Sequence, residues 1–161
     1  MRQKGGDVSY DDLRGVVGLG EAKIPVILAS LELARRYLLD SDQPIIDSPE
    51  KAVELLADIR DKKQEYFVCL TLDGANRLIA KRVVTIGTLT ASLVHPREVF
   101  ADAIADRASS IIVAHNHPSG SMRPSQADIE TTNRLKRAGE LLGIPLMSHL
   151  LITKQSFRVI D

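Results

Sequence analysis

The chain has 161 residues, 44% hydrophobic and 26% charged, and its 21 basic residues balance its 21 acidic ones. This composition is typical of a soluble globular protein and argues against collagen-like, disordered and membrane-spanning classes. The charges also balance within residues 1–40 and within the remainder, so bulk charge does not support strong non-specific binding to nucleic acid. A single cysteine, no signal peptide and no long apolar run together predict a cytoplasmic protein.

Residues 1–40 predict a small helical appendage. Residues 1–9 are polar and lack periodicity, which favours a loose end, and a glycine-rich turn follows over 13–20. The next stretch is helical in pattern, with apolar residues at Ile24, Ile27, Leu28, Leu31 and Ala34. Residues 41–47 then predict a linker to a second domain.

Residues 48–161 alternate between helical and strand patterns and predict one α/β domain. Helices are expected to begin at Ser48-Pro49, at Pro96 and at Ser125, the last ending at Gly143. Strands are expected over residues 66–70, 78–86, 111–114, 146–153 and 157–160. Turn residues over 73–76 join the first two strands as a hairpin, so the predicted fold is a mixed sheet flanked by helices.

The segment from His115 to Asp128 carries the most informative chemistry. His115 and His117 are two positions apart on an extended segment, so both imidazoles can reach one point. Asp128 lies in the first turn of the following helix, and the intervening proline- and glycine-rich loop can bring its carboxylate to the same point. Two imidazoles and one carboxylate, with a fourth position open, form the ligand set of a catalytic zinc ion.

A zinc hydrolase also needs a carboxylate that takes a proton from the attacking water. Glu65 is the candidate, because it directly precedes an apolar strand and would be partly desolvated there. Glu98 is second in line, although its position at a helix start is explained by the helix dipole alone.

Simpler interpretations exist for several of these residues. Paired histidines at a strand end often bond a backbone carbonyl, and Ser125-x-x-Asp128 is by itself a capping box. The capping box is compatible with metal binding, because Ser125 would help to position Asp128. His149 could support a metal ligand or be an ordinary hydrogen-bonded strand histidine, and Cys69 is expected in the core.

The motifs around His115 and Asp128 resemble those of a known family. His115-x-His117-Pro118 followed by Ser125-x-x-Asp128 is similar to the JAMM (MPN+) metalloprotease motif. Residues 48–161 as a whole resemble the bacterial RadC family, with further support from residues 92–100 and 139–145. The resemblance implies a JAMM/MPN-like, cytidine-deaminase-like three-layer domain.

The resemblance also implies an activity and a set of roles. His115, His117 and Asp128 would bind Zn²⁺, Glu65 would act as acid and base, and Ser125 would support the developing oxyanion. The implied reaction is zinc-dependent hydrolysis of an amide bond in a peptide, an isopeptide or a small molecule.

Residues 17–23 resemble the hairpin of a helix-hairpin-helix element. Gly18 and Gly20 would let backbone N–H groups approach a DNA phosphate, which implies weak DNA binding by this segment. The family usually has a longer helical region before this point, so the element is expected to be incomplete and the N-terminus truncated. A glycine turn between two packed helices is the alternative. Two other functions stay open: a DNA-associated protein of repair or recombination, and a non-catalytic interaction scaffold.

Overall fold

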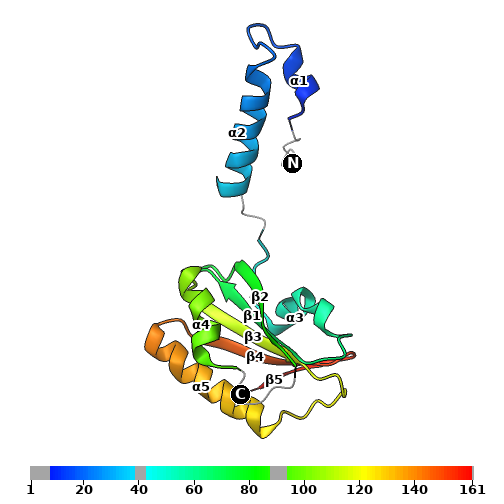
Figure 1. Cartoon of the computed structure of the whole chain (residues 1–161), viewed down its shortest axis with the longest axis vertical. Helices are drawn as coiled ribbons and strands as arrows, with labels where there is room; N and C mark the ends of the chain where they lie inside the picture. Colours follow the sequence, from blue (N-terminus) through cyan, green and yellow to red (C-terminus); the bar gives the residue numbers. More distant parts are fainter. Residues whose placement is uncertain (1–7, 39–42, 88–93, 161) are drawn as a thin grey trace. The chain divides into compact units, whose positions relative to one another are not determined.

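The computed structural model describes residues 8–38, 43–87 and 94–160, and the chain divides into two compact units between residues 42 and 43 (Figure 1). The first unit contains α1 (Tyr10–Arg14) and α2 (Lys23–Leu38), which contact each other. The sequence patterns did not predict α1, whose start is stabilised by a capping box between Ser9 and Asp12. Residues 1–7, most of the predicted loose end, lie outside the described residues.

The apolar face predicted for α2 is only partly buried. Ile24 is 1% exposed, Ile27 and Leu28 are half-buried, and Leu31 is 47% exposed. The side chain of Ala34 lies outside the described part of the chain. This unit therefore has a very small core.

The second unit is built on a mixed five-stranded sheet with the strand order β2-β1-β3-β4-β5. The strands are β1 (Tyr66–Leu72), β2 (Leu78–Ile86), β3 (Ser110–Asn116), β4 (Leu146–Ile152) and β5 (Phe157–Ile160). Only the β3–β4 pairing is parallel; the other neighbours in this sheet are antiparallel. The parallel pair requires a crossover connection, which contains α5.

Helices cover both faces of the sheet (Figure 1). The helices are α3 (Pro49–Leu55), the short 3-10 helix η1 (Ala57–Ile59), α4 (Pro96–Ala105) and α5 (Gln126–Leu142). Alternate residues of β1 and β3 point into two separate cores: Val68 and Ile112 pack with α3, and Phe67 and Val113 pack with α4 and α5. The predicted three-layer α/β architecture is therefore confirmed.

Two strands are longer than the sequence predicted. β1 continues to Leu72, and β3 runs from Ser110 to Asn116 instead of ending at Ala114. β3 is extended because His115 pairs with Phe67 on one side and with Leu151 on the other. His115 therefore lies within the central strand and not in the loop after it.

Helix α5 begins and ends where the sequence predicted. Ser125 is its N-cap, and Gly143 ends it in the left-handed conformation, with φ of 69°. Gly139 has a packing role, because a Cβ atom there would lie 2.6 Å from the carbonyl oxygen of Ile144. Only glycine lets α5 approach the start of β4 this closely.

Part of the predicted linker 41–47 packs on the second unit. Ile45 forms an isolated bridge with Arg77, and Ile46 is 4% exposed in the core beneath α3. The Ile46 N–H donates to the carbonyl of Asn76 at 2.8 Å, so this segment adds apolar contacts and a backbone hydrogen bond to the domain. Residues 41 and 42 lie outside the described part of the chain. Within the described ranges, no helix is long and apolar enough to cross a membrane.

Candidate metal centre

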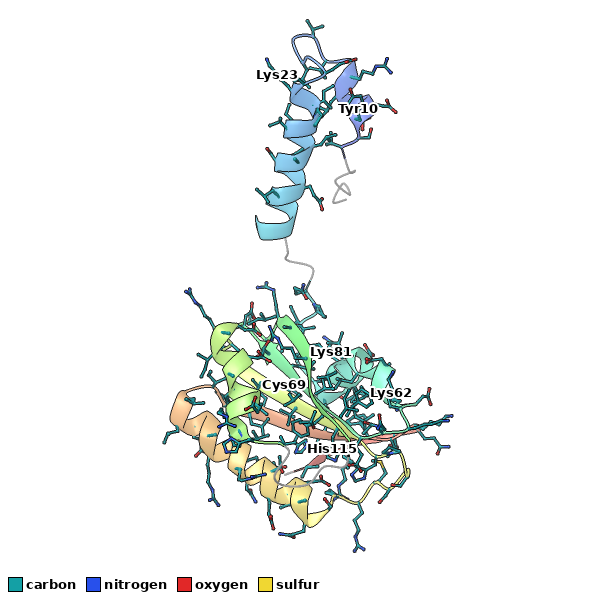
Figure 2. The ribbon with its side chains drawn as sticks, viewed as in Figure 1. Tyr10, Lys23, Lys62, Cys69, Lys81 and His115 are labelled. Atoms are coloured by element: carbon teal, nitrogen blue, oxygen red, sulfur yellow. The ribbon has the colours of Figure 1, made fainter. Side chains whose placement is uncertain are left out.

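Three potential metal ligands converge where β3 ends and α5 begins. His115 pairs with Phe67 in the sheet and therefore lies on the face that α4 and α5 cover (Figure 2). His117 follows β3 directly, and Asp128 lies in the first turn of α5. His115 and Asp128 are buried, whereas the side chain of His117 is 12% exposed and forms the accessible side of the cluster.

The nitrogen and oxygen atoms of the three residues lie close enough together to share one metal ion. The Nε2 atoms of His115 and His117 are 3.2 Å apart, and they lie 3.4 and 3.6 Å from the two carboxylate oxygens of Asp128. Atoms that bind zinc tetrahedrally at roughly 2 Å lie about 3.3 Å from one another. Among the described residues, this cluster could hold a metal ion, with one ligand atom from each residue all within 4.8 Å.

A capping box orients the carboxylate of Asp128. The Ser125 N–H donates to Oδ2 of Asp128 at 2.7 Å, and the Asp128 N–H donates to Oγ of Ser125 at 3.2 Å. The predicted capping box is thus confirmed. It directs Oδ1 of Asp128 towards His115, and it places the exposed Ser125 hydroxyl beside the cluster.

Hydrogen bonds on the opposite ring atoms aim both histidines at the same point. Nδ1 of His117 is 3.0 Å from the carbonyl oxygen of Ser121, and only a ring N–H can donate in that contact. Nδ1 of His115 is 2.9 Å from Nε2 of His149. Each ligand histidine therefore presents Nε2 to the cluster.

The charges of the cluster suit a cation. Hydrogen bonding to Asp128 raises the pKa of His117, with smaller contributions from Ser121 and Glu65. Burial alone would raise the pKa of Asp128, but its interactions with the imidazoles of His115 and His117 outweigh burial and hold that pKa well below its usual range. An ionised carboxylate beside two imidazoles is the state that a metal ion requires.

Glu65 lies close to this cluster but is not part of it. It directly precedes β1, is half-buried, and lines a cleft of about 330 Å³ together with Gly87, Pro118 and Ser119. The Glu65 carboxylate is also a small contributor to the raised pKa of His117. Glu65 therefore brings a carboxylate to the cleft next to Pro118 and Ser119, which follow His117 in the chain.

Asn116 holds the segment that carries Glu65, a contact that the sequence did not predict. Its Oδ1 accepts from the Tyr66 N–H at 2.7 Å, and its Nδ2 donates to the Gln64 carbonyl at 3.0 Å. The Gly87 N–H donates to the Glu65 carbonyl at 2.9 Å from β2. The backbone is thus bonded at Glu65 and at both neighbouring residues. The only signal in the sequence was a polar residue at the end of a buried strand.

Two other residues singled out in the sequence, Glu98 and Cys69, are not among the ligand atoms of the cluster. Glu98 is exposed and pairs with Arg97 at 2.9 Å in the first turn of α4, where His95 is the N-cap and accepts the Arg97 N–H at 3.1 Å. Cys69 is 3% exposed, and burial raises the pKa of its thiol to about 12. Cys69 is thus a core residue, as predicted.

A second cleft, of about 350 Å³, reaches His117 on the side of residues 60–63. Its lining includes the cationic side chains of Arg60, Lys62, Lys63 and Lys154. The exposed edge of His117 is therefore accessible to a molecule from solvent.

The amino-acid sequence of this chain is similar to one protein-family model and to several bacterial and archaeal proteins. A family model described as a RadC-like JAB domain matches residues 46–160. The chain is 47% identical over 154 residues to a UPF0758 protein of Bacillus licheniformis, covering 94% of this chain and 69% of that protein. It is 47% identical over 150 residues to a UPF0758 protein of Methanospirillum hungatei, covering 91% and 67%. It is 45% identical over 154 residues to UPF0758 protein YsxA of Bacillus subtilis, covering 94% and 67%. These names state no activity.

Proposed function

The chain belongs to the RadC-like JAB domain family, and from this premise we propose that it is a zinc-dependent hydrolase of amide bonds. A peptide or isopeptide bond is the proposed substrate. The observation that carries the proposal is the convergence of one ligand atom each from His115, His117 and Asp128, all within 4.8 Å, beside an accessible cleft. We place the activity in the cytoplasm, because the single cysteine of the chain suits a reducing compartment.

Each residue of the site has a separate proposed role in hydrolysis. His115 and His117 would hold zinc through Nε2, and Asp128 would hold it through its carboxylate. Bound zinc would supply a Lewis acid that polarises the amide carbonyl and makes an attacking water more acidic. Glu65 takes the proton of that water and passes it to the nitrogen of the leaving amine. Ser125 donates its hydroxyl hydrogen to the developing oxyanion.

Zinc-dependent hydrolysis can be tested with short peptides and lysine isopeptides, followed by mass spectrometry. We expect cleavage by the zinc-loaded protein, no cleavage after the metal is removed, and recovery when zinc is restored. Equal cleavage by the metal-free protein would contradict the proposal. A protein that binds zinc and cleaves none of these amides would favour the interaction scaffold instead.

A second proposed activity is weak DNA binding by the N-terminal unit. The observation that favours it is the turn between α1 and α2, in which Gly18 has φ of 87°. Such a turn lets backbone N–H groups approach a phosphate.

DNA affinity is expected to be weak, to fall steeply with salt and to be lost when residues 1–40 are deleted, because the proposed contacts are made to phosphate groups. Fluorescence anisotropy with a labelled duplex at several salt concentrations measures all three. Tight, salt-resistant binding that survives the deletion would contradict this assignment.

A further inference from the structure

Two buried polar residues, Thr132 and His149, lie behind His115. Nε2 of His149 is 2.9 Å from Nδ1 of His115, and Nδ1 of His149 is 2.6 Å from Oγ1 of Thr132. The Thr132 hydroxyl is also 2.7 Å from the backbone carbonyl of Asp128. His115 and Thr132 are 0% exposed, and His149 is 1% exposed. We call this series of contacts the His115–His149–Thr132 chain.

When both histidines are neutral, each hydrogen bond of the His115–His149–Thr132 chain has only one possible donor and one possible acceptor. A carbonyl oxygen only accepts, so the single hydroxyl hydrogen of Thr132 is donated to Asp128. Oγ1 of Thr132 must then accept from His149, which therefore carries its hydrogen on Nδ1. Nε2 of His149 is left as an acceptor, so His115 donates from its own Nδ1. The hydrogen of His115 is thereby kept away from Nε2, the atom that faces His117 and Asp128.

The His115–His149–Thr132 chain also connects two candidate ligands, His115 and Asp128, that come from different secondary-structure elements. His115 belongs to β3, His149 to β4, and Thr132 and Asp128 to consecutive turns of α5. The ring of Phe67 stacks on His115 at 6.3 Å and meets the edge of His149 at 5.5 Å. The rings are therefore restrained both by packing and by hydrogen bonds.

We propose that Thr132 and His149 are positioning residues for the metal site, which hold His115 in the tautomer whose Nε2 can bind the ion and fix its distance from Asp128. This inference rests on the proposed zinc site. Hydrogen-bond partners of metal-binding histidines typically change metal affinity by about 10–100-fold when they are removed.

The test compares three substitutions on α5 in the full chain. Thr132→Val keeps the shape of the side chain but removes the hydroxyl, and Thr132→Ser keeps the hydroxyl. Thr131→Val is the matched control, because Thr131 is also buried, at 5% exposed, but its hydroxyl accepts from Arg134, which is not part of the His115–His149–Thr132 chain. Zinc dissociation constants come from competition with a chelator of known affinity. We expect Thr132→Val to bind zinc at least ~10-fold more weakly, and the other two variants to bind within a few-fold of wild type.

The tautomers supply a second readout that a purely structural role of Thr132 would not change. Long-range ¹H–¹⁵N NMR of the zinc-loaded wild type should show hydrogen on Nδ1 of both His115 and His149. In Thr132→Val, His149 loses its acceptor, and the fraction protonated on Nδ1 should fall. Zinc affinity and tautomers like those of wild type in Thr132→Val, or an equal loss of affinity in Thr131→Val, would overturn the inference while leaving the zinc site intact. A wild-type protein that takes up no zinc would instead overturn the proposed function on which the inference rests.

Discussion

Glu65→Gln is expected to lower the rate of amide hydrolysis by at least ~10²-fold, the usual effect of losing a general base. Glutamine keeps the shape and polarity of the side chain but cannot accept a proton at neutral pH. Zinc content should stay near that of wild type, because Glu65 lies outside the group of ligand atoms. Initial rates and metal content, measured on the same preparation, test both statements.

Glu98→Gln is the matched control for this substitution. Glu98 is an exposed carboxylate paired with Arg97, and its loss should change neither the rate nor the zinc content. If Glu65→Gln lost its zinc, Glu65 would be a ligand or a direct support of one. If Glu65→Gln kept full activity, Glu65 would not be the base.

Asp128→Asn is expected to abolish zinc binding and hydrolysis together. A neutral amide is a poor ligand compared with a carboxylate, and the substitution also removes the negative charge beside His115 and His117. The loss of zinc affinity should exceed the ~10–100-fold typical of losing a hydrogen-bond partner of a ligand. A chelator competition measures the affinity, and hydrolysis is assayed in parallel.

Thermal unfolding gives an independent check on Asp128→Asn. Zinc should raise the melting temperature of wild type, because a ligand that binds only the folded state stabilises it. The variant should show no such rise. Asp47→Asn, which changes an exposed carboxylate paired with Lys51, should respond to zinc as wild type does. Normal zinc binding by Asp128→Asn would remove Asp128 from the ligand set.

Much of the fold could be predicted from local patterns. Short apolar and β-branched runs indicated every strand of the second unit, and caps with helical periodicity indicated most of its helices. The turn residues over 73–76 indicated the hairpin that makes the sheet mixed. The ends of β3 could not be predicted locally, because they depend on pairing with Phe67 and Leu151 far away in the chain. The short helix α1 lacks buried residues and therefore left no periodic signal.

The three candidate ligands could be predicted because their chemistry and spacing are visible in a short segment. The residues that hold the site in place could not be predicted. Asn116 bonds Tyr66 across 50 residues, and His149 bonds His115 across 34. Both contacts depend on strand register, which could not be predicted from the sequence. The interval of four residues from Asp128 to Thr132 is visible in the sequence. The sequence does not show that β4 places His149 within hydrogen-bond distance of Thr132.

Zinc titration of the metal-free protein measures the proposed metal centre itself. We expect uptake of about one zinc ion per chain, held tightly enough to survive gel filtration, because three ligands of the types that zinc prefers converge within 4.8 Å of one another. Elemental analysis of the protein after gel filtration supplies the number. A protein that contains no transition metal after gentle purification and takes up none on titration would contradict the account.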